Sequence, residues 1–312
     1  MIKLGLIGAG RWGRNYIRTI AGMKGVRLDL VASQNPETAG MVSEGCRVVP
    51  DWMTVAQAPG LQGVIIATPP ALHAEMAQAV IELGMPVLIE KPLTLSLAEA
   101  TKLRKLAAER ESFVMVDHTH LFNPAFRAMR ELGAHLGPLK AMWGEAGNHG
   151  PFRKDADVLW DWGSHDVAMC LDLAMRMPDQ VQAQMIESRT VDDGIAQSLR
   201  LDLSFPGDAA ARIELSNLLP EKRRRFTAYF ELATLVFDDL APVKLSLHPP
   251  SDPFLPPEGE GEAIDTASAM PLELVVREFA DAILCERDDL NSLDLAVAVV
   301  AVLEEAARKV NG

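Results

Sequence analysis

The sequence predicts an α/β protein of two domains: an N-terminal doubly wound parallel sheet, and a C-terminal α+β domain with a large, open-faced, mostly antiparallel sheet. Three observations lead to this prediction. The chain has 312 residues, and a common domain has about 150. As far as about residue 120, short apolar runs alternate with helical stretches. Beyond that point, strand-like runs follow one another with few helices between them, so we expect domains at residues 1–120 and 121–312.

The N-terminal strands are predicted from short apolar runs that are continuous rather than alternating, which is typical of parallel strands buried on both faces. The runs are KLGLIGAG, LDLVAS, GVIIATPP, PVLIEKP and SFVMVDH. Helices are predicted between them at WGRNYIRTIAGM, HAEMAQAVIELG and SLAEATKLRKLAAERE. In the last of these helices, Ser96 and Glu99 have the spacing of a capping box.

The C-terminal region opens with the helix PAFRAMREL, the strand LKAMWGEAG and the helix DWGSHDVAMCLDLAM. Runs of more alternating character follow: QVQAQMIES, AQSLRLDLSF, ARIELSN, RRFTAYFEL and TLVFDD. This order favours an antiparallel sheet with helices on one face. Residues 249–270, rich in Pro, Gly and acidic residues, are predicted to be a loop, and two helices at about 271–285 and 293–310 close the chain.

The composition excludes several classes of partner. A formal net charge of −13 would repel nucleic acid or an anionic membrane, so we expect neither as a partner. The three cysteines form no CxxC pair, and no cluster of Cys, His and acidic residues has metal-ligand spacing, so we expect no disulfide framework and no metal. The sequence shows no signal-peptide pattern and no apolar run long enough to span a membrane, which favours the cytoplasm.

The motif GAGRWG places Gly8, Gly10 and Gly13 in GxGxxG spacing, between the first predicted strand and the first predicted helix. In this position the glycines allow a tight turn, let a diphosphate approach backbone N–H groups and let the helix pack on the sheet. The alternative is a glycine-rich turn that serves packing alone. The context of strand and helix favours a dinucleotide site.

Ser33 stands about 20 residues after the glycines, where an acidic residue would hold the adenosine ribose of NAD and repel the 2′-phosphate of NADP. Serine repels neither cofactor, and Arg11 offers a positive charge near the glycines. We therefore expect NADP or NAD, with NADP slightly favoured. The alternative is that Ser33 only ends a strand.

Lys91 stands at the end of a predicted strand, after Glu90 in the sequence VLIEKPL, and ligands of open parallel sheets bind at the carboxyl ends of the strands. A lysine there can donate to a substrate oxygen, with Glu90 to position it, and Pro92 is a residue type that allows a cis peptide bond. An exposed lysine after a strand is the common alternative.

The motif WDWGSHD separates Asp161 and His165 by four residues, which places them on one face of a helix. A carboxylate beside an imidazole can orient it as a base. Spacing alone is better explained by an N-cap aspartate and a packed core histidine, so the hypothesis depends on the combination with the glycine motif and Lys91.

The chain resembles the Gfo/Idh/MocA family of oxidoreductases over nearly its whole length. The motifs that carry the resemblance are GAGRWGRN, the block ATPPALHAEMAQAVIELGMPVLIEKPLTLSLAEA, FNPAF, DWGSHDVAMCLDL and FADAI. The resemblance implies a Rossmann domain followed by an open-faced sheet that mediates dimer contacts, so we expect a homodimer or homotetramer formed through the C-terminal sheet. It also implies that Lys91, Asp161 and His165 are catalytic.

Two further sets of residues are expected at the site. The cofactor set, carried by the resemblance and the strand ends, comprises Gly8, Gly10, Arg11, Trp12, Gly13, Ser33, Thr68, Pro69, His73, Glu90 and Lys91. The substrate set comprises His118, His120, Asn148, Arg153 and His165. For His73 a helix-start histidine, and for Asn148 and Arg153 solvated loop residues, are the alternatives. The chain departs from the family pattern at Ser33, in VDHTHLF and in ELA before TLVFDD.

Together these features predict an NAD(P)-dependent oxidoreductase that transfers a hydride between the nicotinamide and a secondary alcohol or ketone of a sugar, cyclitol or related polyol. One alternative is a cofactor-binding regulatory protein without turnover. The other is a reductase that acts on a non-carbohydrate carbonyl or imine.

Overall fold

The computed structural model describes residues 1–152, 157–192 and 194–311, which divide into two compact units. The first unit comprises Met1–Thr119 and Met270–Val300. The second comprises His120–Ala269 and the chain from Ala301 onward. Of the substrate residues expected from the sequence, Arg153 lies outside the described residues.

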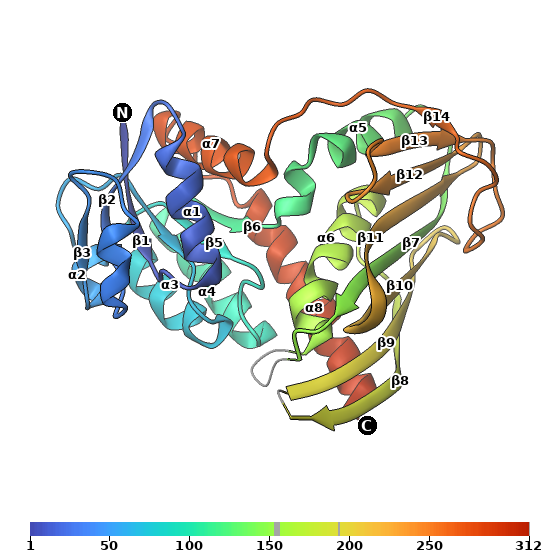
Figure 1. The fold of residues 1–312 in the computed structure, drawn as a ribbon, viewed down its shortest axis with the longest axis horizontal. Coiled ribbons are helices and arrows are strands. Elements are labelled where there is room, and N and C mark those ends of the chain that lie inside the picture. The colour runs from blue at the N-terminus through green and yellow to red at the C-terminus, as the bar shows by residue number, and fades with distance from the viewer. Residues whose placement is uncertain (153–156, 193, 312) are drawn as a thin grey trace. The chain divides into compact units, whose positions relative to one another are not determined.

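The first unit contains a six-stranded parallel sheet with the strand order β3-β2-β1-β4-β5-β6 (Figure 1). Its strands are β1 (Ile2–Ile7), β2 (Val26–Ala32), β3 (Arg47–Val49), β4 (Gly63–Ile66), β5 (Val87–Glu90) and β6 (Val114–Asp117). The order reverses at β1, which pairs with β2 on one side and with β4 on the other. Such a switch point, at the carboxyl ends of the strands, is where doubly wound sheets bind ligands. The predicted doubly wound sheet is confirmed.

Helices connect these strands and complete the first unit. They are α1 (Arg11–Ala21), α2 (Trp52–Ala56), α3 (His73–Glu82), α4 (Leu97–Arg110), α7 (Pro271–Leu284) and the first half of α8 (Asn291–Asn311), with 3₁₀ helices at Pro36–Gly40 and Pro70–Leu72. A further 3₁₀ helix, Thr119–Phe122, spans the boundary between the two units. The sequence places α7 with the second domain, whereas the structure places it in the first unit. The reason is packing: the buried ring of Phe279 lies 6.3 Å from that of Phe113 and directly over Gly63, where any side chain would collide with it.

The capping box predicted for α4 is wrong. Ser96 occupies the N-cap position, but its side chain makes no capping hydrogen bond. Glu99 is exposed in the first turn, where its charge still interacts favourably with the helix dipole.

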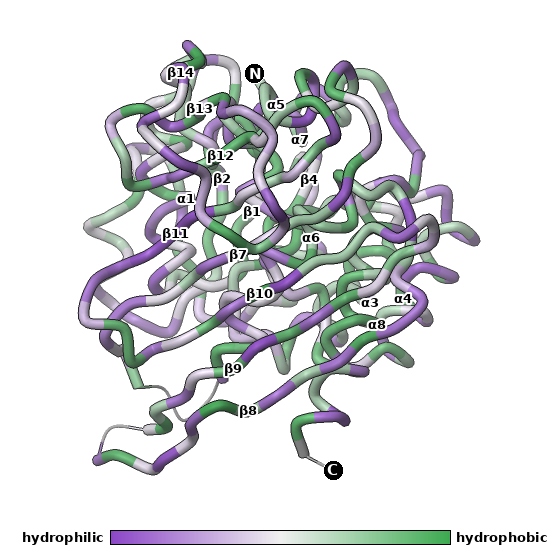
Figure 2. Tube along the Cα trace, turned by 90° about the vertical axis from the view of Figure 1, so that its right-hand side faces the viewer, coloured by the Kyte–Doolittle hydropathy of each residue, from purple (hydrophilic) through white to green (hydrophobic). Residues whose placement is uncertain are grey.

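The described part of the second unit contains an eight-stranded sheet with the order β14-β13-β12-β11-β7-β10-β9-β8. Only the pair β7 and β10 is parallel among its described strand pairs. The strands are β7 (Leu139–His149), β8 (Gln180–Val191), β9 (Gly194–Ser204), β10 (Ala210–Ser216), β11 (Leu218–Phe230), β12 (Thr234–Asp238), β13 (Leu245–His248) and β14 (Glu262–Ala263). Along β8 and β9 the hydropathy in Figure 2 alternates between neighbouring residues, as expected for strands with one exposed face. The predicted mostly antiparallel sheet is confirmed.

Two helices of the second unit, α5 (Pro124–Gly133) and α6 (Ser164–Ala174), lie on the same side of this sheet (Figure 1). α5 packs on β12 and β13, and α6 packs on β7 and β10. The predicted helix from Asp161 begins differently from expectation, because Leu159–Gly163 forms a π-helical turn before α6. No helix of the described residues is long and apolar enough to cross a bilayer.

Candidate active site

The glycine loop joins the end of β1 to the start of α1, and its three glycines are under different constraints. Gly8 has a φ of +96°, and a Cβ there would lie 2.7 Å from the carbonyl oxygen of Ala67. A Cβ at Gly13 would collide with the carbonyl oxygen of Gly8. A Cβ at Gly10 would meet no protein atom within 4 Å. The turn and the helix packing therefore require Gly8 and Gly13, whereas Gly10 leaves open space beside the loop.

The N-terminus of α1 is suited to an anion. Gly10 is its N-cap residue, no side chain caps the helix, and the first turn, which begins with Arg11 and Trp12, contains no acidic residue. The first N–H groups of a helix lack partners within the helix, and the dipole adds a partial positive charge. Arg11 is exposed and contributes a full charge nearby. These residues fit the diphosphate of a dinucleotide cofactor.

Ser33 follows β2 directly, at the edge of the sheet that carries the glycine loop. Its hydroxyl is hydrogen-bonded to the Thr38 hydroxyl at 2.8 Å and accepts from the backbone N–H of Asn35 at 3.2 Å. Ser33 is thus part of the turn after β2, and it brings no charge to that turn.

His73 connects the segments that follow β4 and β5. Its Nε2 lies 2.9 Å from the carbonyl oxygen of Thr68, and its Nδ1 lies 2.9 Å from that of Pro92. The side chain is fully buried, and burial lowers the pKa of His73. The role that this geometry supports is to fix Thr68 and Pro69 relative to the Lys91–Pro92 bond, which is cis.

Lys91 follows β5 and belongs to what we call the strand-end cluster: Tyr16, Glu90, Lys91, Asp117 and Thr119. Tyr16 and Asp117 are fully buried, and Glu90 and Lys91 retain 4% and 7% of their exposure. The Tyr16 hydroxyl donates to one oxygen of Asp117 at 2.5 Å, and the Thr119 hydroxyl donates to the other at 2.7 Å. The sequence alternative, an exposed lysine after a strand, does not hold for this position.

In the second unit, His120 and His165 lie ring to ring. Their centroids are 4.3 Å apart, and the ring planes are inclined by 17°. His165 is the second residue of α6, and Asp161 lies in the π-helical turn before it. Asp161 and His165 are thus four residues apart across the junction of the π-helical turn and α6, and their placement on one helical face stays a prediction.

The other expected substrate residues lie in different surroundings. His118, in the first unit, is buried. Asn148 is half-buried on β7, and its buried Oδ1 has no hydrogen-bond partner among the described residues. An unpartnered amide oxygen of this kind is available to a ligand hydroxyl. Lys91 belongs to the first unit, whereas Asn148, Asp161 and His165 belong to the second.

Sequence reasoning missed three buried polar residues. Asp117 ends β6, so the rule that ligands bind at strand ends could have found it. Tyr16 gives no such signal, because in the sequence it is indistinguishable from the other apolar positions of α1. Asp166 follows His165 and is buried, and burial raises its pKa to about 7 although the charge of Arg224 lowers it.

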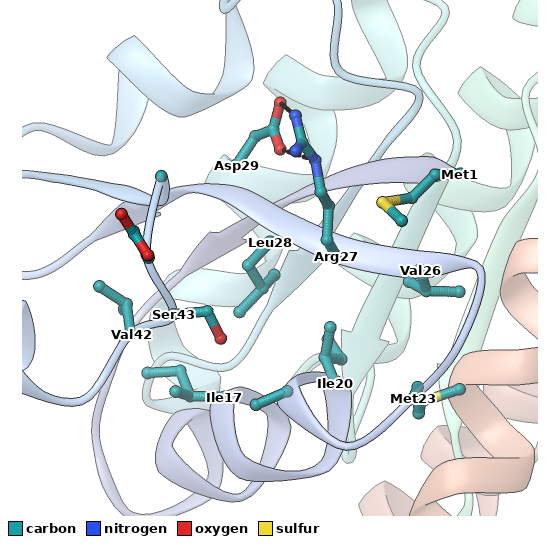
Figure 3. Close-up of a pocket in the computed structure, with 13 residues that line it drawn as sticks. Met1, Ile17, Ile20, Met23, Val26, Arg27, Leu28, Asp29, Val42 and Ser43 are labelled. Carbon is teal, nitrogen blue, oxygen red and sulfur yellow. Dashed lines mark hydrogen bonds and ion pairs between the residues drawn. The ribbon is translucent and has the colours of Figure 1, made fainter.

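A cavity of about 210 Å³ lies away from the glycine loop, at the start of β2 (Figure 3). Ile17, Ile20 and Val42 line it, beside an ion pair between Arg27 and Asp29 of 2.6 Å. It presents no buried unpaired polar group to a ligand. Across residues 1–152, 157–192 and 194–311, no group of three or more His, Cys, Asp or Glu side chains is arranged to hold a metal ion.

Comparison with known proteins agrees with this geometry. A family model described as an oxidoreductase family with an NAD-binding Rossmann fold matches residues 2–118. A crystal structure from Magnetospirillum magnetotacticum MS-1 is 46% identical in sequence, with a TM-score of 0.92, and the match covers 97% of this chain and 98% of that one.

Two relatives of known activity are more distant. UDP-N-acetylglucosamine 3-dehydrogenase of Acidithiobacillus ferrooxidans is 27% identical over 92% of this chain and 90% of its own length, and its solved structure matches with a TM-score of 0.84. Inositol 2-dehydrogenase 4 of Saccharopolyspora erythraea is 32% identical over 44% of this chain and 42% of its own. With the glycine loop and the two sheets described above, these similarities show that the chain belongs to the Gfo/Idh/MocA family of oxidoreductases, with an NAD-binding Rossmann fold.

Proposed function

We propose that the protein transfers a hydride between a nicotinamide cofactor and a secondary alcohol or ketone of a sugar, cyclitol or related polyol. The observation that carries the proposal is the placement of Lys91, buried among acidic groups at the carboxyl edge of the sheet that bears the glycine loop. Burial of a lysine side chain is unusual, because desolvation of its ammonium group is unfavourable. A hydrogen bond donated by Lys91 to a substrate oxygen, as the chemistry of the family requires, explains this burial.

Each catalytic residue has a proposed role. Lys91 polarises the reacting oxygen of the substrate. His165 takes the hydroxyl proton during oxidation and returns it during reduction, and Asp161 orients the imidazole. The nicotinamide, when bound, supplies the hydride acceptor or donor. The residues proposed to hold the cofactor are the glycine loop, Ser33, Thr68, Pro69 and the strand-end carboxyl of Glu90.

We propose NADP or NAD as the cofactor, with NADP slightly favoured. The support for this preference is that Ser33 carries no charge where a carboxylate would repel a 2′-phosphate, and that Arg11 is exposed near the glycine loop.

The proposed substrate class follows the relatives, which are named for a UDP-linked amino sugar and for inositol. The decisive experiment is a panel of sugars, cyclitols, UDP-linked sugars and cyclic imines, assayed with both cofactors by absorbance of the reduced nicotinamide. Turnover of a sugar or cyclitol supports the proposal. Turnover of imines alone would indicate the second type of reductase, and tight cofactor binding with no turnover would indicate a regulatory protein.

We further propose a cytoplasmic homodimer or homotetramer assembled through the C-terminal sheet. The support for the interface is that the sheet carries exposed apolar side chains such as Ile186 beside ion pairs such as Arg223 with Glu145, at 2.6 Å. The support for the compartment is that Cys46, Cys170 and Cys285 are free thiols. Sedimentation equilibrium tests the assembly, and a monomer at micromolar concentration would contradict it.

A further inference from the structure

The stacked rings of His120 and His165 belong to two segments of the second unit that are held in different ways. His165 is part of α6, and the residues on either side of it, Ser164 and Asp166, are buried. His120 lies in the 3₁₀ helix Thr119–Phe122, whose four residues are all half-buried. The position of the His120 ring therefore depends on what holds the short segment between this 3₁₀ helix and α5.

Asn123 ends that segment and caps α5. Its backbone N–H donates to the carbonyl oxygen of His120 at 3.1 Å. Its side-chain Oδ1 accepts from the N–H of Ala125 at 3.0 Å, so it satisfies a donor of the first helical turn. Asn123 is itself buried. It thus couples the backbone of His120 to the start of α5.

Asp239 binds the amide nitrogen of Asn123. Asn123 Nδ2 donates to Asp239 Oδ1 at 3.1 Å, and a carboxylate acceptor strengthens such a hydrogen bond. Asp239 follows β12 and is anchored on β11 in two ways. Its N–H donates to the carbonyl oxygen of Arg224 at 3.0 Å, and its Oδ2 forms an ion pair with Arg224 Nη1 at 3.5 Å. One carboxylate therefore ties the cap of α5 to the sheet.

We propose that Asp239 is a positioning residue for the stacked histidines: through Asn123 it holds the His120 segment in place, and the His120 ring then restricts the rotation of His165. The inference rests on the role proposed for His165 as the base. Precise placement of a reacting group is a large part of catalysis, so loss of this tether should lower the rate of the chemical step. Asp239 acts through Asn123 and need not touch the substrate.

The first test breaks the tether without removing the helix cap. Asn123→Asp keeps an N-cap residue, because aspartate caps a helix as well as asparagine does, but it sets a second carboxylate against Asp239. The kcat for alcohol oxidation should fall by about tenfold to a hundredfold, with KM and the cofactor Kd near those of the wild type. A kcat equal to that of the wild type would overturn the inference.

A second substitution in the same chain should rescue the first. Asp239→Asn added to Asn123→Asp restores a donor opposite an acceptor, with the direction of the hydrogen bond reversed. We expect the double variant to recover most of the lost kcat. If the double variant is no faster than Asn123→Asp, the loss does not come from the contact between residues 123 and 239, and the inference fails.

The matched control removes a different tether on the same two helices. Asp172 of α6 forms an ion pair of 3.3 Å with Arg130 in the last turn of α5, away from the stacked rings. Asp172→Ala should keep the wild-type kcat. A loss as large as that of Asn123→Asp would show that general loosening of α5 and α6 lowers the rate, and this result would contradict a specific role for Asp239.

The third test needs no substrate. In proton NMR spectra of the histidine-labelled protein, the ring current of each imidazole should shift the Hε1 resonance of the other. His120→Phe and His165→Asn assign the two resonances by their loss. In Asn123→Asp both should move toward the positions of unstacked histidines, and in the double variant they should return. Unchanged resonances in Asn123→Asp would show that the stack does not depend on Asp239.

The two levels of the account fail separately. If His165→Asn retains turnover, the role proposed for His165 is wrong, and the NMR spectra still test whether Asp239 positions the rings. If His165→Asn is inactive while Asn123→Asp keeps the wild-type kcat and resonances, His165 stays in the mechanism, and only the role of Asp239 is overturned.

Discussion

The imidazole rings of His120 and His165 are stacked, with centroids 4.3 Å apart and planes inclined by 17°. His165 lies in the first turn of α6, whereas His120 precedes α5 by four residues, so two separate segments of the second unit fix this pair. A flat ring packed on His165 restricts the rotation of its side chain. We therefore expect His120 to help orient His165, in a way that does not require contact with the substrate.

The first prediction concerns this pair. His165→Asn should lower kcat for alcohol oxidation by about 10² to 10⁴, the usual contribution of a general base. Asp161→Asn should cause a smaller loss through misorientation. His120→Ala should lower kcat, and His120→Phe should restore most of it because a flat ring keeps the stack. If His120→Phe instead raised KM and left kcat low, His120 would be a substrate contact, as the sequence suggests.

The second prediction separates two glycines of the same loop. Gly10→Ala should fold as the wild type does, because the φ of −68° at residue 10 suits alanine and its Cβ meets no protein atom within 4 Å. Its Cβ would occupy the space expected for the diphosphate, so the Kd for the cofactor should rise at least about tenfold, or 1.4 kcal/mol. Gly13→Ala should lower Tm by several degrees, because its Cβ collides with the Gly8 carbonyl oxygen. If Gly10→Ala bound the cofactor with wild-type affinity, this loop would not be the binding site of the diphosphate.

The third prediction concerns Ser33→Asp. The carboxylate would face the 2′-phosphate, and juxtaposed like charges cost several kcal/mol, so kcat/KM with NADP should fall on the order of a hundredfold or more. The value with NAD should change little, because the same carboxylate can accept from the free ribose hydroxyl. A wild-type enzyme already strongly selective for NAD, and unchanged by the substitution, would show that Ser33 does not discriminate.

The fourth prediction is a dependence of stability on pH through Asp166. Burial raises the pKa of Asp166 to about 7, from an ordinary 3.8 in the unfolded chain. The folded protein then binds the proton more tightly, so the stability from this group is complete below pH 3.8 and is lost as the pH rises through about 7. The span corresponds to on the order of 4 kcal/mol. In urea denaturation, Asp166→Asn should gain stability relative to the wild type between pH 5 and pH 8, and a difference independent of pH would contradict this.

Local patterns predict the strands that are buried on both faces, such as β1 and β5, because each is a continuous apolar run. They do not predict β3, since Arg47–Val49 is a three-residue edge strand with no pattern of its own. Nor do they predict the packing of α7, because the contact between Phe279 and Gly63 joins residues far apart in the sequence.

The candidate site shows the same limit. Lys91 and the glycine loop are predictable, because each lies at a strand end within a short motif. The link from Tyr16 to Asp117 joins residues 101 positions apart, and only the folded chain reveals it. The π-helical turn at Leu159–Gly163 has no local sequence signal either, so the sequence predicts a helix here but not its π-helical start.

The fifth prediction concerns Lys91 itself. Lys91→Ala should bind the cofactor as the wild type does, because Lys91 acts on the substrate oxygen rather than on the diphosphate. Its turnover should fall by about 10² to 10⁴ on any sugar or cyclitol that the wild type oxidises or reduces. Cofactor titration by nucleotide fluorescence gives the Kd of both proteins and serves as the control for folding of the first unit.

The decisive measurement is therefore kcat for Lys91→Ala and the wild type, with the best substrate of the panel at saturating cofactor. If Lys91 acts on the substrate oxygen, the cofactor Kd stays unchanged while kcat falls about a hundredfold or more. A Lys91→Ala variant with a kcat near that of the wild type would show that Lys91 has no part in the chemistry.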